Sequence, residues 1–316
     1  MNTATPLVSI CCITYNHENY IRDAIEGFLM QKTTFPIEII IHDDASTDST
    51  TDIIKDYSQK YPDLFITILQ TENQYSKGIK PFPTYVLPIV RGKYIAVCEG
   101  DDYWIDPHKL QKQVDFLEEN LDFGLVYTKV KYSNQSKNKI VRKQWGGPST
   151  TFESLFSHNV IPTLTVVLRN EILKNYEQEI EPITKNWKAG DYPMWLYIAL
   201  KSKIHFIDQI TGVYRVIEGS VSNQNDFTKQ VNFIKSIFSM KLFFVEYAKS
   251  GISKERVIDA MYENIGTRAL LLKNRELANM YLKRINKYSI KSFTKKVISS
   301  SSLLSYFYSK ILNSKN

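Results

Sequence analysis

Three short polar clusters each follow an apolar run in the first 104 residues of the sequence. They are "TYN" (14–16), "HDDASTD" (42–48) and "EGDDYW" (99–104), and the third holds three carboxylates within four residues. Carboxylates that converge repel one another unless a cation or a donor-rich ligand compensates their charge. Mg²⁺ and Mn²⁺ prefer oxygen ligands and often bridge to phosphate. If the clusters meet in the fold, they predict a site for such a metal.

Structural roles compete with this interpretation, because acidic residues after strands are often helix caps or turn formers. Asp48, Asp52 and Asp106 fit capping better than chemistry. The pair Asp43–Asp44 fits it less well, since other residues already supply the caps nearby. Asp101–Asp102 fits it least, because Asp106 is expected to cap the helix that follows and leaves the pair without a structural task.

The surrounding pattern predicts the elements that would position these clusters. Near-continuous apolar runs indicate buried strands, and apolar residues at helical spacing between them indicate covering helices. This order favours an α/β fold of the Rossmann-like kind, with a mainly parallel sheet flanked by helices, whose ligands bind at the carboxyl ends of the strands. The expected strands are 7–13, 37–44, 65–70 and 93–98, and the expected helices are 18–31, 46–61 and 106–117, with a short helix or loop at 81–90.

The second half of the chain changes character at about residues 222–228. Before it, strands are expected at 124–133, 161–169 and 203–216, with a polar loop at 134–143 and a helix at 193–200. After it the pattern is helical only, with helices expected at 227–249, 254–264, 275–288 and 293–312. We therefore expect an α/β domain over residues 1–222 and an all-helical, basic region over residues 223–316.

The net charge of the chain also changes sign at about residue 226. The net charge of +7 combines −4 up to residue 225 with +11 from residue 226 onward, and no acidic residue follows Glu276. Interleaved with apolar positions, this tail would suit the inner face of a membrane, or it packs on neighbouring helices with its lysines in water. Both interpretations stay open. Nucleic-acid binding is not expected, because no recognised nucleic-acid module accompanies the charge.

Apolar segments and cysteines favour a cytoplasmic protein. No apolar run reaches the roughly 18 residues of a membrane span, and the first residues lack the features of a secretory signal. Cys11, Cys12 and Cys98 lie in apolar runs without metal-ligand spacing, so we expect reduced, packed thiols. A homo-oligomer is compatible with the composition.

Four ordered stretches resemble family 2 glycosyltransferases of the GT-A fold. They are "VSICCITYNHENYIRDAIEGFLMQ", "IIIHDDASTDST", "GKYIAVCEGDDYW" and "AGDYPMWLYIAL", and the resemblance covers about residues 6–217. It implies a non-processive enzyme, since the Q-x-x-R-W signature of processive synthases is absent. It also implies a cytoplasmic setting in surface polysaccharide assembly, with a nucleotide-sugar donor and a glycan or lipid-linked acceptor.

The resemblance implies roles for single residues on the donor side. Thr14, Tyr15 and Asn16 match the turn that holds the nucleotide, with Tyr15 against the base. Asp44 matches the carboxylate that accepts from the base imide, which favours a UDP-sugar. Asp101 and Asp102 match the acidic motif that holds the donor and a Mn²⁺ or Mg²⁺ ion, with Asp102 the main metal ligand.

On the acceptor side, Asp191 matches the general base, although Gly190 precedes it where the family often has an acid. Arg215 matches a candidate phosphate contact in a closing loop at 214–222. Glu99 stands in place of a commoner aspartate, and either joins the site or shapes its turn. A single base acting in a single displacement predicts inversion of anomeric configuration.

Loop residues and competing functions remain to be weighed. Asn73 and Lys80, between the third and fourth strands, either contact a diphosphate or face water. Thr163 and Thr165 belong to an expected core strand and could face the acceptor.

A nucleotidyltransferase would need a Gly-rich phosphate loop, which the first polar cluster lacks, and a phospho-receiver module would not explain Asp191. A catalytically silent binding scaffold remains an alternative.

Overall fold

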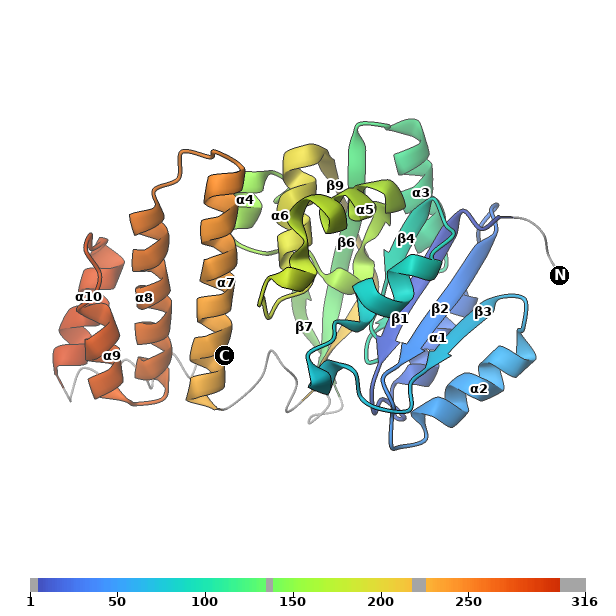
Figure 1. Cartoon of the computed structure of the whole chain (residues 1–316), viewed down its shortest axis with the longest axis horizontal. Helices are drawn as coiled ribbons and strands as arrows, with labels where there is room; N and C mark the ends of the chain where they lie inside the picture. Colours follow the sequence, from blue (N-terminus) through green and yellow to red (C-terminus); the bar gives the residue numbers. More distant parts are fainter. Residues whose placement is uncertain (1–4, 135–138, 218–225, 302–316) are drawn as a thin grey trace. The chain divides into compact units, whose positions relative to one another are not determined.

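The computed structural model describes residues 5–134, 139–217 and 226–301. Their strands are β1 Val8–Thr14, β2 Ile37–Asp43, β3 Phe65–Leu69, β4 Tyr94–Val97, β5 Tyr103–Trp104, β6 Phe123–Asn134, β7 Lys139–Trp145, β8 Val167–Arg169 and β9 Lys203–Val216. The α-helices are α1 Ile21–Leu29, α2 Thr50–Lys60, α3 Lys109–Glu119, α4 Phe152–Ser157, α5 Asn170–Ile180, α6 Tyr192–Lys201, α7 Phe227–Tyr247, α8 Lys254–Leu271, α9 Arg275–Leu282 and α10 Ile290–Ser300. The expected α/β fold with a helical C-terminal region is confirmed (Figure 1).

One mixed sheet carries all the strands of the described residues, in the order β3-β2-β1-β4-β8-β6-β9-β5, with β7 on β6. The first four strands are mutually parallel, and β6 runs parallel to β9. β8 is antiparallel to both β4 and β6, which joins the two parallel parts. Figure 1 shows β1, β2 and β3 side by side in the blue part of the chain.

The central strands are apolar because both of their faces are covered. Ile10 and Cys12 of β1 and Ile39 of β2 belong to one core with the inward face of α1, and Ile25 and Phe28 supply that face. Side chains at helical spacing on α1 therefore meet side chains at strand spacing on β1 and β2. This packing sets which ends of the strands carry the polar clusters.

Three expected boundaries differ from the structure. The polar loop expected at 134–143 is shortened, because β7 begins at Lys139 and pairs antiparallel with the end of β6. The strand expected at 161–169 is reduced to β8, because the chain after Pro162 first forms a 3₁₀ turn over Thr163–Thr165. The helix expected to be capped by Asp106 begins at Lys109, and the Asp106 carboxylate instead accepts from the backbone N–H of His108 (2.9 Å). Residues bonded within local turns are not available to extend a regular element.

The chain forms two compact units, one of Met1–Lys185 with Asp191–Glu218 and one of Asn186–Gly190 with Gly219–Asn316. The boundary expected at 222–228 begins in the segment 218–225, outside the described residues. In the second unit α8 is longer than expected and α9 shorter, and the part of the last expected helix beyond residue 301 also lies outside. No helix among the described residues is long and apolar enough to cross a membrane.

Lys109 is a buried cation in the first unit. Its side chain is fully covered, and its Nζ lies 4.2 Å from the centroid of the Trp104 ring. That nitrogen has no hydrogen-bond partner among the described residues. Burial lowers the pKa of Lys109 to about 7, while the charges of Cys98 and Asp106 act in the opposite direction. An amine in this position costs folding free energy whenever it is protonated.

We expect Lys109→Met to stabilise the protein, because it removes the desolvated amine and keeps an unbranched apolar side chain. The unfolded lysine holds its proton up to a pKa near 10.5 and the folded one up to about 7, so wild-type stability rises with pH between these values. The slope is at most about 1.4 kcal/mol per pH unit. The advantage of the variant should be largest near pH 7 and shrink toward pH 10. Urea unfolding at several pH values measures it, with the exposed Lys55→Met as control. An advantage that stays constant with pH would contradict this.

Candidate functional site

The carboxyl ends of β1, β2 and β4 meet at one edge of the sheet. Thr14, the last residue of β1, is in register with Asp43, the last residue of β2. The backbone N–H of Asp44 donates to the carbonyl of Thr14 (3.0 Å), and the N–H of Gly100 donates to the carbonyl of Ile13 (3.0 Å). The three polar clusters of the sequence therefore lie together at this edge.

The loop after β1 is locked against the loop after β2. Asn16 has a left-handed backbone (φ 54°), which asparagine tolerates better than most residues. Its N–H donates to Oγ of Ser46 (2.8 Å), and its Oδ1 accepts from the N–H of Thr47 (2.8 Å). The side chain of Tyr15 is 42% exposed. The two loops thus form one ordered edge that leaves an aromatic ring open to a ligand.

The two adjacent aspartates after β2 have different partners. Asp43 is buried and accepts from the hydroxyls of Ser46 and Thr51. Asp44 is also buried, but its Oδ1 accepts from the N–H of Gln74 (2.8 Å) and its Oδ2 from the N–H of Tyr75 (3.0 Å). Asp43 therefore holds its own loop, whereas Asp44 orders the turn that follows β3.

That turn brings Asn73 to Asp44 and takes Lys80 elsewhere. Nδ2 of Asn73 donates to the carbonyl of Asp44 (3.2 Å). Nζ of Lys80 donates to the carbonyl of Pro182 (2.8 Å). Desolvation lowers the pKa of Lys80, while the charge of Glu177 acts to raise it. Asn73 thus lies beside the predicted donor residues, and Lys80 would have to leave its carbonyl partner to reach a phosphate.

A tight turn follows β4 and carries the acidic motif. The N–H of Asp102 donates to the carbonyl of Glu99 (3.1 Å). A Cβ at Gly100 would lie 2.6 Å from Oγ1 of Thr14, so only glycine fits at this point of the turn. Desolvation raises the pKa of Glu99 to about 8, and the negative charges of Asp101 and Asp191 add to the rise. Glu99 therefore both shapes the turn, through its carbonyl, and places its carboxyl among the other acids.

Asp102 lies at the buried centre of this motif. Its Oδ1 accepts from the backbone N–H of Arg215 (2.7 Å). Desolvation raises the pKa of Asp102 well above its ordinary range, the charges of Asp101 and Glu99 raise it further, and Arg215 opposes them. Several carboxyl groups are thus held closer together than their ionised forms favour, which is the electrostatic condition that a bound cation relieves.

Arg215, near the end of β9, orders the acidic turn. Nη1 donates to the carbonyl of Asp101 (2.9 Å), and Nη2 forms an ion pair with Asp23 of α1. The guanidinium carbon lies 4.3 Å from the centroid of the Tyr103 ring. The backbone N–H and the guanidinium of Arg215 therefore hold Asp102 and Asp101 from one side. The guanidinium is already bonded to the carbonyl of Asp101 and the carboxylate of Asp23.

Asp191 caps the first turn of α6, and its charge acts on Glu99 of the acidic turn. Its Oδ1 accepts from the N–H of Tyr192 (2.7 Å), and its Oδ2 accepts from the hydroxyl of Thr163 (2.6 Å). The capping and functional interpretations of Asp191 are thus compatible. Its charge contributes to the raised pKa of Glu99, so the two carboxyl groups interact. Asp191 belongs to the same site as the acidic turn.

Two members of the site could not be found from the sequence. Asp23 meets Arg215 across 192 residues of chain. Nδ1 of His17 is buried without a hydrogen-bond partner among the described residues, and a Cβ at Gly100 would lie 3.1 Å from it. Burial lowers the pKa of His17, although the charge of Asp101 opposes this. The only sequence signal for His17 is its position just after the first polar cluster.

The chain matches the family model described as Glycosyl transferase family 2 over residues 9–176. It is 32% identical over 237 residues to WfaP of Escherichia coli, named UDP-Glc:alpha-D-GlcNAc-diphosphoundecaprenol beta-1,3-glucosyltransferase, covering 73% of this chain and 86% of WfaP. It is 36% identical over 210 residues, 66% of its length, to an uncharacterised protein of Mycobacterium tuberculosis, and this match spans only 58% of that protein.

Two solved structures share the fold at low sequence identity. S. aureus TarS 1-349 in complex with UDP-GlcNAc superposes with a TM-score of 0.62 at 16% identity, over 96% of this chain and 91% of that chain. The mannosyltransferase PcManGT from Pyrobaculum calidifontis in complex with GDP-Man and Mn²⁺ gives a TM-score of 0.54 at 15% identity, over 97% and 88%. The sequence match and the fold agree: the chain belongs to glycosyl transferase family 2.

Proposed function

We propose that this chain transfers a sugar from a nucleoside-diphosphate sugar, a UDP-sugar, to a hydroxyl of a glycan or lipid-linked acceptor in surface polysaccharide synthesis. The observation that carries the proposal is that the charge of Asp191 acts on Glu99 of the acidic turn, at the edge where β1, β2 and β4 end. Family membership supports the reaction class, and the activity in the name of WfaP supports the donor and the lipid-linked acceptor.

The donor's base is proposed to lie beside Asp44, Asn73 and Tyr15. Each carboxylate oxygen of Asp44 accepts one backbone N–H, which fixes its orientation and leaves a further lone pair on each for a base imide. Tyr15 is exposed where it can stack on the base. Thr14 contributes an Oγ1 that is buried without a hydrogen-bond partner among the described residues. A carboxylate accepts the ring N–H of uracil or guanine but not of neutral adenine or cytosine, and the donor in the name of WfaP favours a UDP-sugar.

The acidic turn fits a divalent metal bound together with the donor. No group of three or more His, Cys, Asp or Glu side chains in the described parts of the chain is arranged to hold a metal ion alone. Mg²⁺ and Mn²⁺ commonly take one or two carboxylates and complete their shell with phosphate and water. Asp102 and Asp101 are the proposed ligands, and the raised pKa of Asp102 reflects a charge that a cation would offset. When bound, the ion supplies positive charge against the leaving diphosphate.

Asp191 is proposed to act as the general base. The acceptor oxygen attacks the anomeric carbon as its proton passes to Asp191. The bond from that carbon to the diphosphate breaks, and the nucleoside diphosphate leaves with the electron pair. Thr163 and the N–H of Tyr192 each donate to a different oxygen of Asp191, so the carboxylate is held in one orientation. One displacement inverts the anomeric configuration, and no second nucleophile is needed.

Binding of UDP with Mn²⁺ tests the metal assignment. We expect UDP to raise the melting temperature by a few degrees with Mn²⁺ and by much less without it, since a ligand at a hundredfold excess over its Kd stabilises by about 2.7 kcal/mol. Asp102→Asn should abolish the metal-dependent part. Asp52→Asn, an exposed acid on α2, should retain it. Because each protein is compared with itself with and without Mn²⁺, changes in intrinsic stability do not confuse the result. A metal-dependent rise in melting temperature that persists in Asp102→Asn would contradict the assignment of Asp102 as a metal ligand.

Substitution of Asp191 separates the enzyme from a silent binding scaffold. Asn keeps an oxygen for capping α6 but cannot take a proton, so Asp191→Asn should lower kcat by roughly 10²–10⁴-fold while UDP binding stays intact. Turnover is followed as UDP release from UDP-sugars in the presence of a lipid-linked acceptor. Unchanged turnover in this variant would exclude Asp191 as the base. If the wild-type protein binds UDP but neither variant nor wild type releases it from any UDP-sugar, the scaffold alternative is favoured.

A further inference from the structure

Helix α10 in the second unit exposes three apolar side chains and buries three polar ones, while Ile298 packs against the core of the unit. Ile290, Phe293 and Val297 are 90%, 57% and 45% exposed, and their spacing places them on one face of the helix. The opposite face carries Ser292, Lys295 and Ser299, all buried. An amphipathic helix of a soluble protein normally shows the reverse.

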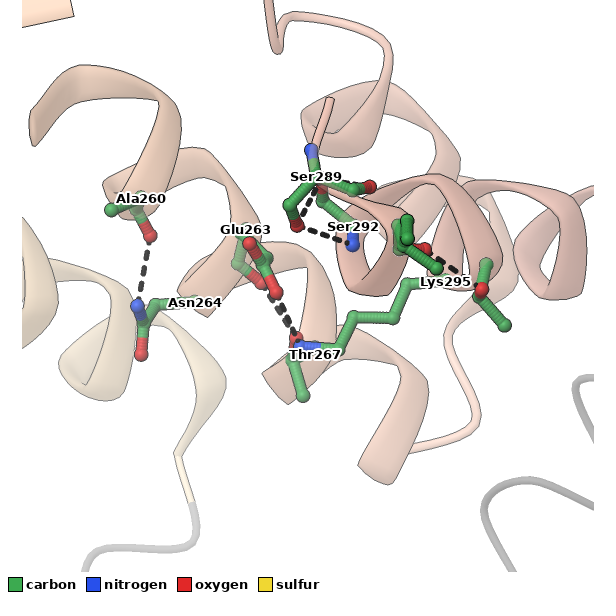
Figure 2. Close-up of polar contacts among 9 residues, drawn as sticks. Ala260, Glu263, Asn264, Thr267, Ser289, Ser292 and Lys295 are labelled. Carbon is green, nitrogen blue, oxygen red and sulfur yellow. Dashed lines mark hydrogen bonds and ion pairs between the residues drawn. The ribbon is translucent and has the colours of Figure 1, made fainter. Parts of the chain in front are cut away.

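Polar contacts hold the helix in this orientation. Nζ of Lys295 forms an ion pair with Glu263 of α8 (2.8 Å), as Figure 2 shows. Ser289 and Ser292 form a capping box at the start of the helix, with Oγ of Ser289 accepting from the N–H of Ser292 (3.0 Å). Rotating the helix to bury its apolar face would break the ion pair and leave the carboxylate of Glu263 in a partly buried position without its cation.

The surroundings of this apolar face are basic. No acidic residue follows Glu276, and Lys283, Arg284 and Lys287 are exposed just before α10. Lys296 lies beside the face on the helix itself, with its Nζ 4.3 Å from the centroid of the Tyr288 ring. Figure 2 shows Glu263 beside Lys295, so this nearby carboxylate is already paired.

The second nearby carboxylate is also engaged. Asp259 of α8 is buried, and its two oxygens accept from the backbone N–H groups of Asn286 (2.8 Å) and Lys287 (2.9 Å). These bonds pin the segment that leads into α10 to α8. Asp259 and Glu263 therefore serve internal contacts, whereas Glu255 is exposed and interacts with the charge of Lys287. Lys283 and Arg284 are exposed near the helix, where an outside partner can reach them.

We propose that the exposed face of α10, defined by Ile290, Phe293 and Val297, docks on the surface of an anionic phospholipid membrane. The three apolar side chains would enter the boundary between headgroups and acyl chains, and the flanking cations would meet the lipid phosphates. A second copy of the chain is disfavoured as occupant, because it would bring the same basic surface against this one. Nucleic acid is disfavoured because the face has one aromatic side chain, Phe293, and a single ring does not make a stacking platform for successive bases. The proposal goes beyond the transfer reaction and stands without it.

Vesicle sedimentation of the full chain tests the proposal. The wild-type protein should sediment with vesicles that contain phosphatidylglycerol, bind far less to pure phosphatidylcholine, and lose affinity as salt is added. Ile290→Ser with Phe293→Ser should weaken binding to the anionic vesicles roughly tenfold or more, because both side chains lose most of their apolar area. Leu121→Ser, which removes an exposed apolar side chain of the first unit, is the matched control and should bind like wild type.

Two further measurements guard the interpretation. Circular dichroism melting should show the double variant folded, since it changes exposed side chains only. Phe293→Trp should retain binding and gain a blue-shifted emission with anionic vesicles, which reports entry of this residue into the bilayer.

Equal vesicle binding by wild type and double variant would overturn the proposal, as would absence of wild-type binding. A wild-type dimer that the double variant converts to monomer, without vesicle binding, would identify a second copy as the occupant. A protein truncated after Ser301 is a further comparison. If it binds vesicles more tightly than the full chain, and the double substitution does not change that binding, the exposed face of α10 is not the membrane contact and the proposal is overturned.

Discussion

The candidate site depends on holding several carboxyl groups close together at one edge of a sheet. Neighbouring groups of like charge disfavour the folded state unless the chain supplies compensating contacts. Arg215 supplies them, because its backbone N–H binds Asp102 and its guanidinium binds the carbonyl of Asp101. Burial first, and then the charges of the neighbouring acids, still raise the pKa values of Glu99 and Asp102.

Hydrogen bonds between the loops around the acids hold these loops in place. The left-handed turn at Asn16 is tied to the loop after β2, and Asp44 is tied to the turn after β3. Each tie uses a backbone N–H that would otherwise need water or another acceptor. Side chains that could interact with a ligand are therefore presented by loops with satisfied backbones, which reduces the conformational entropy that binding has to remove.

The fold and the location of the site could be predicted because they depend on local patterns. Buried parallel strands are apolar on both faces, and their polar ends fall at the same edge, so the convergence of Thr14, Asp44 and Glu99 follows from chain order. The exact partners could not be predicted. Asp23 is bound to Arg215 by tertiary packing alone, and the strand expected at 161–169 is shortened by a turn whose Thr163 binds Asp191. Lys80 could not be placed either, since its carbonyl partner comes from a distant turn.

Helical spacing leaves open whether the apolar residues of α10 pack on neighbouring helices or face outward, because both arrangements use the same pattern. The ion pair of Lys295 with Glu263 decides the orientation instead.

The three cysteines gain a property from their neighbours. Cys12 and Cys98 lie buried beside the acidic turn, and burial followed by the nearby carboxylates raises the pKa of both thiols well above the ordinary value. Peroxides and alkylating reagents attack the thiolate and not the thiol. Burial and the neighbouring negative charges therefore keep the sulfur atoms of Cys12 and Cys98 protonated, so the protein should tolerate oxidants without losing the geometry of its site.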